Sequence, residues 1–222
     1  MIKFDLDFFY QLIPTMIHYL PVTISISFYA LIIGFILAVI IATAVEMELK
    51  GFSQLAKVYV SFFRGTPLVA QLFLLYFGSV QIFPILINMS AYTASVIGLG
   101  LNASAYMSET IRGAISAVDK GQMEAALSIG MTPLQAMSKI ILPQAARVAI
   151  PALSNNFIDI VKGSALAFTI GVTEIMATAQ MEGASAYRFL EAFTAVVLIY
   201  WVLISSLSFG QKRLELYMNR FC

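Results

Sequence analysis

The chain has 222 residues, of which 60% are hydrophobic and 11% are charged, and its formal net charge is +1. An ordinary soluble domain carries roughly a quarter charged side chains, so this composition argues against a water-exposed surface and predicts an integral membrane protein. The small net charge excludes nucleic-acid binding, and one cysteine with one histidine argues against a disulfide framework, a metal centre or a histidine-based catalytic triad.

The first membrane span is expected within residues 8–45, which contain no Asp, Glu, Lys or Arg. That is more than the roughly 20 residues that a helix needs to cross a bilayer core. Residues 65–108 are also free of these charges. Four residues interrupt that segment where a turn would fall: Gln81, Pro84, Asn88 and Ser90. This pattern predicts two spans joined by a short hairpin, with the second running to about Gly113.

A fourth span, broken or short, is expected at 148–172, where Pro151 enters an otherwise apolar sequence. Asp159 and Lys162 lie inside it, three residues apart, so that on a helix they share a face and can neutralise each other. The last span is expected at 192–211. The sequence therefore predicts an all-α membrane protein of five spans that forms one domain, 1–222.

Lysine and arginine are unevenly distributed between the connecting segments, which predicts the orientation of the chain. With the amino terminus outside, the inner segments hold Lys50, Lys57, Arg112, Lys120, Lys139, Arg147, Lys212, Arg213 and Arg220. The outer segments hold only Lys3 and Arg188. We therefore expect a multi-pass protein with its amino terminus outside and its carboxyl terminus in the cytoplasm.

The segment 114–147, between the third and fourth spans, is much longer than a connector needs to be. Asp119 followed by Gln122 indicates a capping box, and Gly130 indicates a left-handed helix stop. A second short helix is expected to begin at Thr132, Pro133 and Gln135. Its apolar face would hold Leu134, Met137 and Ile141, and Pro143 is expected to end it.

Two short helices under a membrane domain can lie on the lipid headgroups. Here Glu124 precedes two small residues, Ala125 and Ala126, and the glycine at the corner lets another backbone approach closely. That shape favours insertion into a groove of a partner protein.

Seven positions of this loop match the EAA-loop signature of ATP-binding-cassette (ABC) importer permeases: Glu124, Ala125, Ala126, Gly130, Ile140, Leu142 and Pro143. The chain thus resembles the transmembrane subunit of such importers. The resemblance implies a type I ABC importer permease fold of five transmembrane helices, located in the bacterial cytoplasmic membrane. It also implies that the loop is a coupling helix that docks in a cleft of a separate ATPase subunit.

The resemblance extends from about Leu20 to Leu216 and fits the polar amino acid subfamily. Phe63–Leu68 match its second-span motif, and Glu109, Arg112 and Ile115 match the end of its third span. L-cystine permeases look similar at 119–126, at 129–133 and at 142–148. One departure lies at 162–166, where those proteins usually have Lys, Asp, Thr, Ser, Leu and this chain has Lys, Gly, Ser, Ala, Leu.

Polar residues at membrane depth are costly, so they are candidates for a substrate path. Two stripes at helical spacing carry them: Asn102, Tyr106 and Glu109 on the third span, and Asn155, Asp159 and Lys162 on the fourth. Facing one another, the stripes could bind the ammonium group of an amino acid through carboxylates and its carboxylate through Lys162 or amides. Alternatively, the asparagines only join helices, the Asp159–Lys162 pair satisfies itself, and Glu109 pairs with Arg112 at a helix end.

The sequence contains no glycine-rich phosphate loop, so ATP and Mg²⁺ would be bound by a partner ATPase, and the chain itself would be a non-catalytic permease subunit without a cofactor. The other expected partners are a second permease subunit, identical or homologous, an extracytoplasmic solute-binding protein and the lipid bilayer. L-cystine is the favoured solute, with arginine, histidine, glutamine or glutamate as alternatives. A self-sufficient ion-coupled carrier or channel is the rival interpretation, because polar stripes alone would permit it.

Overall fold

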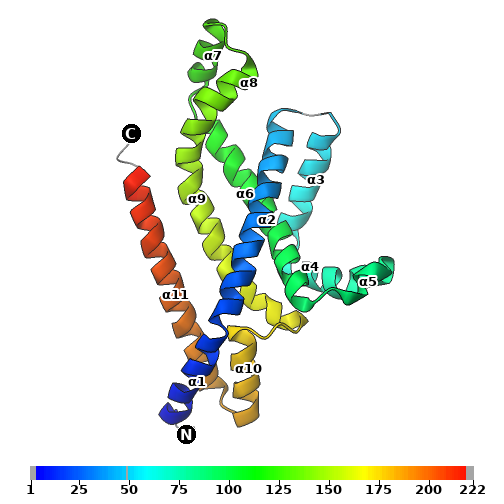
Figure 1. The fold of residues 1–222 in the computed structure, drawn as a ribbon, viewed down its shortest axis with the longest axis vertical. Helices are drawn as coiled ribbons and strands as arrows, with labels where there is room; N and C mark the ends of the chain where they lie inside the picture. The colour runs from blue at the N-terminus through cyan, green and yellow to red at the C-terminus, as the bar shows by residue number, and fades with distance from the viewer. Residues whose placement is uncertain (1–3, 49, 219–222) are drawn as a thin grey trace.

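The computed structural model describes residues 4–48 and 50–218, and the regular structure in these residues is helical (Figure 1). In chain order the α-helices are α1 (Leu6–His18), α2 (Leu20–Glu46), α3 (Phe52–Gly65), α4 (Leu68–Phe73), α5 (Ser79–Ile82), α6 (Ala91–Ser116), α7 (Lys120–Ser128), α8 (Pro133–Ala136), α9 (Leu142–Gly163), α10 (Ile175–Ala186) and α11 (Phe189–Met218). The π-helical turns η1 (Leu74–Gly78) and η3 (Met137–Ile141) and the 3-10 segments η2 (Pro84–Asn88) and η4 (Ser164–Ile170) connect some of them. Lys3 and Arg220, which entered the charge count, lie outside the described residues.

The segment expected to form one uninterrupted first span is divided at Tyr19 into α1 and α2. Pro21 lies in the first turn of α2, where its missing N–H has no helical partner to lose. Residues 6–46 together still form one long apolar helical segment of 41 residues. Since about 20 residues cross a bilayer core, part of this stretch must lie beyond a single crossing.

The second predicted span is wrong in its extent, because the chain bends by 111° between α3 and the α4–α5 segment. The expected span begins after Arg64, whereas α3 already contains Lys57 and ends at Gly65. Thr66 is extended, with φ −123° and ψ 149°, because the ring of Pro67 disfavours helical geometry in the preceding residue. The predicted hairpin holds the 3-10 segment η2, and the Ser90 side chain caps the start of α6.

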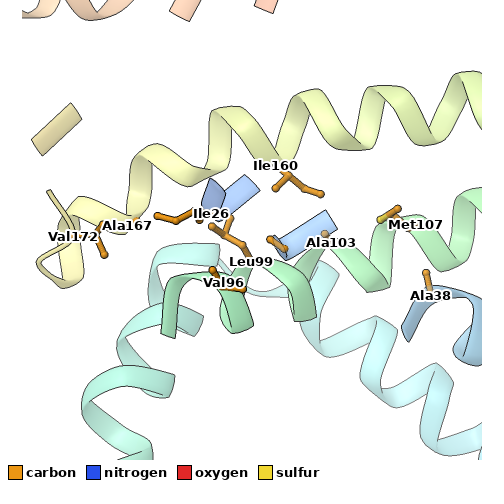
Figure 2. Close-up of a cluster of buried hydrophobic side chains, with 10 residues drawn as sticks. Ile26, Ala38, Val96, Leu99, Ala103, Met107, Ile160, Ala167 and Val172 are labelled. Carbon is orange, nitrogen blue, oxygen red and sulfur yellow. The ribbon is translucent and has the colours of Figure 1, made fainter. Parts of the chain in front are cut away.

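The core lies where α2, α6 and α9 pack together, and Figure 2 shows its buried side chains. These are Ile26, Ala30, Ala38, Val96, Leu99, Ala103, Met107, Ile160, Ala167 and Val172. Small residues bring α2 and α6 close, since a Cβ on Gly34 would lie 3.2 Å from the backbone oxygen of Gly100. Close approach of small residues is the usual way in which helices pack in membranes, where dispersion contacts replace the hydrophobic drive.

The prediction that Pro143 ends the second loop helix is wrong. The helix continues from α8 through the π-turn η3 into α9, which begins at Leu142. Proline cannot donate to the carbonyl four residues earlier and its ring crowds that carbonyl, and the wider π-turn accommodates both effects. The loop between α6 and α9 is therefore shorter than the expected 114–147.

The fourth span was expected to be irregular because of Pro151, but α9 continues through that proline and the break comes after Ile170. A helix that the sequence did not indicate, α10, follows the break. Segment 133–170 is bent by 49° against α10. Glu174 is fully buried at this bend, and its carboxylate accepts hydrogen bonds from the backbone N–H of Ala177 (2.8 Å) and the hydroxyl of Tyr200 (3.3 Å). The last helix, α11, runs from 189 to 218 and exceeds the expected 192–211 at both ends.

Among the described residues, two helical segments are long and apolar enough to cross a membrane, or up to four if each bent pair counts as one span. In Figure 1, α7 and α8 lie at one end of the molecule and the amino-terminal helix α1 lies at the opposite end. The last turns of α11 point toward the α7–α8 end. The pair of helices α7 and α8, which we call the elbow, is thus separated from α1 by the length of the bundle.

Candidate functional site

The elbow between α7 and α8 is held by local hydrogen bonds. Asp119 caps α7 by accepting from the N–H of Gly121 at 2.7 Å, so the cap is present but the expected reciprocal bond with Gln122 is not formed. At the other end, Gly130 has φ +85°, and Met131 N–H bonds to the Ala126 oxygen (3.1 Å) while Gly130 N–H bonds to the Leu127 oxygen (3.0 Å). This is a Schellman stop, as the glycine predicted.

The second arm of the elbow begins at Thr132, as predicted, and it has the complete capping box that was expected at Asp119 and Gln122 instead. The Thr132 hydroxyl accepts from Gln135 N–H at 3.3 Å, and the Gln135 side chain accepts from Thr132 N–H at 2.9 Å. In η3 the Ile140 carbonyl accepts a bond of 2.9 Å from the Gln144 amide. The predicted shared face is only partly buried, because Ile141 is buried while Leu134 is 68% exposed.

The seven signature residues divide between the surface and the interior of the elbow. Five are exposed: Glu124, Ala125, Gly130, Leu142 and Pro143. Ala126 is buried and Ile140 is half-buried. Several apolar side chains of the elbow are exposed, with Leu127 at 43%, Ile129 at 80% and Leu134 at 68%, and groups of exposed apolar side chains are typical of surfaces that contact a partner or a membrane.

A hollow of about 260 Å³ lies between α4, α6 and α9. Its polar lining comes from Asn102, Tyr106, Asn156 and Asp159. Three of these were predicted as path residues, so the structure does bring parts of the two stripes together. A larger hollow of about 510 Å³ between α2, α9 and α11 has a lining with no charged side chain, which makes the smaller one the candidate for a polar solute.

Asn102 also joins helices, which was the alternative interpretation. Its amide donates to the Gln71 side-chain oxygen (2.9 Å) and to the Phe63 carbonyl (3.2 Å). Gln71 in turn donates to the Phe63 carbonyl (3.0 Å) and to the carbonyl (3.1 Å) and hydroxyl (2.8 Å) of Thr66. These carbonyls belong to the broken end of α3, where the helix offers them no N–H partner. The amide network therefore stabilises the 111° bend.

Glu109 lies between two guanidinium groups. It contacts Arg112 at 2.7 Å and Arg64 at 3.7 Å, and the Arg64 guanidinium lies 5.6 Å from the centre of the Tyr106 ring. The expected Glu109–Arg112 pair is therefore present. Its extension to Arg64 ties the end of α3 to α6 beside the hollow.

Asn155 and Lys162 do not line this hollow, so the three residues of the second predicted stripe do not line one hollow together. The Asn155 oxygen accepts from Gln211 on α11 at 2.9 Å. Lys162 pairs with Asp159 at 2.7 Å, as expected, but it lines a separate hollow beside Tyr200 and Trp201. Asn155 and Asp159 are four residues apart and lie within about 40° of each other around α9. The asparagine is nevertheless bonded to α11, whereas Asp159 lines the hollow.

Sequence reasoning missed Asn156, whose oxygen accepts from the Thr110 hydroxyl at 3.1 Å. Asn156 lies three residues before Asp159, so the same spacing rule could have selected Asn156 instead of Asn155. Reasoning also missed Gln71, although it follows the predicted motif at 63–68 by three residues. Gly163, where the sequence departs from L-cystine permeases, lies beside the hollow, since a Cβ there would contact Leu68 and Leu99 of the hollow wall.

Comparison with known proteins adds a family to this geometry. A family model described as "Binding-protein-dependent transport system inner membrane component" matches residues 30–220. The "Probable amino-acid ABC transporter permease protein PatM" of Vibrio harveyi is 50% identical over 217 residues, covering 98% of this chain and 97% of that protein. The "L-cystine transport system permease protein TcyB" of Bacillus subtilis (strain 168) is 39% identical over 201 residues, covering 90% and 84%.

A solved structure shares the fold. The "Crystal structure of an amino acid ABC transporter with histidines" superposes with a TM-score of 0.89 at 36% sequence identity, covering 96% of this chain and 99% of that chain. The L-cystine relative is less similar than PatM, so similarity does not select cystine as the solute.

Proposed function

The chain belongs to the family of binding-protein-dependent transport system inner membrane components, as a permease subunit of an amino-acid ABC importer, and we propose distinct roles in transport for its elbow and its hollow. The elbow receives force from a separate ATPase, which holds ATP and Mg²⁺. The hollow is part of the path of a polar amino acid. A second permease subunit and an extracytoplasmic solute-binding protein complete the importer.

The observation that carries the coupling role is the exposed tip at Ile129, held in one shape by the Schellman stop and the following capping box. A rigid, small and partly apolar projection suits insertion into a protein cleft. Because η3 makes α8 continuous with α9, displacement of the elbow would be transmitted to α9, which carries Asp159. Access to the path would then alternate between the two sides of the membrane.

Five spans are the topology that we propose for this fold. The two long segments and the two bent pairs supply four. Helix α6 would be the fifth, since its 26 residues at about 1.5 Å each reach about 39 Å, enough for a bilayer core. With the elbow in the cytoplasm, the carboxyl terminus lies inside and the amino terminus outside, in agreement with the lysine and arginine count.

L-cystine is the solute that we favour within the amino acid class, with arginine, histidine, glutamine and glutamate as alternatives. The hollow offers the Asp159 carboxylate for an ammonium group and the Asn156 amide for a carboxylate, whereas the amide donors of Asn102 are engaged by Gln71 and Phe63. A self-sufficient carrier would need no elbow for an ATPase, so dependence of transport on the elbow separates the two interpretations.

The test is co-purification of the partner ATPase, together with ATP-driven uptake of labelled cystine in proteoliposomes. Glu124→Lys and Gly130→Trp should each abolish most of both signals, since one reverses a charge on the docking surface and the other forces a bulky side chain into left-handed backbone. Glu48→Lys is the matched control, because it makes the same charge change in the exposed α2–α3 turn. Unchanged ATPase binding and uptake in both elbow variants would contradict the proposal.

A further inference from the structure

The charged groups around the hollow do not balance. Two carboxylates, Asp159 and Glu109, face three cationic side chains, Lys162, Arg64 and Arg112. Among these five described side chains, which form two ion-paired groups at Tyr106 and Asp159 of the lining, one positive charge therefore remains in excess. An unbalanced charge at membrane depth is costly unless a counter-charge accompanies it.

Of the two guanidinium groups that share Glu109, that of Arg64 is the less closely bound. Arg112 lies 2.7 Å from one carboxylate oxygen, whereas Arg64 lies 3.7 Å from the other, an ion pair too long for a hydrogen bond. The other charged or aromatic contact that the described residues give Arg64 is the Tyr106 ring at 5.6 Å. The side chain of Arg64 remains 46% exposed, so its guanidinium donors are available to a ligand.

Lys162 cannot fill the same role in this arrangement. Its ammonium group lies 2.7 Å from Asp159, and the side chain lines the hollow beside Trp201 instead. A guanidinium also matches a carboxylate better than an ammonium group does, because its planar fork can bind both oxygens at once. Arg64 is thus the best-placed group to receive a carboxylate that enters beside Tyr106.

From this geometry we propose that Arg64 binds a carboxylate of the transported amino acid and that the hollow selects neutral or anionic amino acids over cationic ones. The inference rests on the proposed amino acid path and specifies its substrate class. A zwitterion leaves the excess charge as it is, an anionic amino acid neutralises it, and a cationic amino acid doubles it. Arginine is accordingly disfavoured, while glutamate, glutamine and cystine are compatible.

The test is equilibrium binding of labelled glutamate, glutamine and arginine to the permease–ATPase complex in lipid nanodiscs, without the solute-binding protein. Omitting that protein confines the measurement to the selectivity of the path. Wild type should bind glutamate at least as tightly as glutamine, and arginine about tenfold or more weakly, as expected for loss of a charge-assisted contact. Arg64→Gln should weaken glutamate binding about tenfold and leave arginine binding unchanged or stronger.

Three comparisons make the result decisive. Arg64→Lys should retain part of the glutamate affinity, and Lys57→Gln, which removes an exposed charge from the same helix, should change nothing. Retained arginine binding shows that Arg64→Gln is folded. Preferential binding of arginine by wild type, or an equal loss of glutamate and arginine in Arg64→Gln, would overturn the inference and leave the permease function intact. Failure of wild type to bind or transport any amino acid would count against the proposed function itself.

Discussion

Replacing Asn102 with leucine tests the claim that an amide network holds the bend between α3 and α4. The variant removes two hydrogen bonds, of 2.9 Å to Gln71 and 3.2 Å to the Phe63 carbonyl. The carbonyl keeps its bond from Gln71, but the buried Gln71 oxygen loses the partner that Asn102 supplies. An orphaned buried acceptor costs about 1–3 kcal/mol, so we expect the free energy of unfolding to fall by that amount.

The assay is unfolding of the purified permease in mixed micelles, followed by the fluorescence of the single tryptophan, Trp201. Gln71→Leu should cost more than Asn102→Leu, because Gln71 also bonds to Thr66. The double variant should lose about 0.6–1.7 kcal/mol less than the sum of the single losses, the range of interhelical pairs in membranes. The control Asn88→Leu, at an exposed position, should stay within about 0.5 kcal/mol of wild type. Strict additivity of the two single variants would refute the network.

Three further predictions concern the elbow, the α2–α6 contact and the amino-terminal helix. Gly130→Ala should destabilise the elbow by about 1 kcal/mol, because φ is +85° there, and should weaken ATPase co-purification, whereas Gly113→Ala, in open helical space, should not. Gly34→Val should lower the free energy of unfolding by about 1–3 kcal/mol, since its side chain would meet backbone that cannot yield, and a neutral result in the same micelle titration would contradict the packing described. Glu191→Leu should release α1, because the Glu191 carboxylate accepts from Asp5 N–H at 2.9 Å, and faster proteolysis within residues 6–18 would show this release.

The elbow could be predicted from sequence because its determinants are local. Gly130, Thr132 and Gln135 act on backbone groups within a few residues of themselves, so capping rules suffice to place the corner. The same rules failed at Pro143, where a π-turn lets the helix continue. Whether a proline ends a helix or is absorbed depends on packing elsewhere in the chain, which local rules do not contain.

The hollow was less predictable because it depends on how helices rotate against one another. Helical spacing placed Asn102, Tyr106 and Asp159 on faces that do meet, but it also grouped Asn155 with them, and that side chain lies against α11. A single sequence predicts the rotation of each helix about its own axis only to within about one residue position. The bend after Gly65 was visible in principle, since a residue before proline disfavours helix, yet its 111° angle is set by tertiary contacts.

The most direct test of the central claim is the accessibility of Ala125, on the exposed face of α7. In a background with Cys222 replaced by serine, Ala125→Cys and the exposed control Ser185→Cys, on α10, are each treated with a membrane-impermeant maleimide. In intact cells Ser185→Cys should be labelled and Ala125→Cys should not. In inside-out vesicles Ala125→Cys should be labelled only after the ATPase is stripped away. Labelling of Ala125→Cys from outside intact cells, or labelling unaffected by the ATPase, would contradict the account.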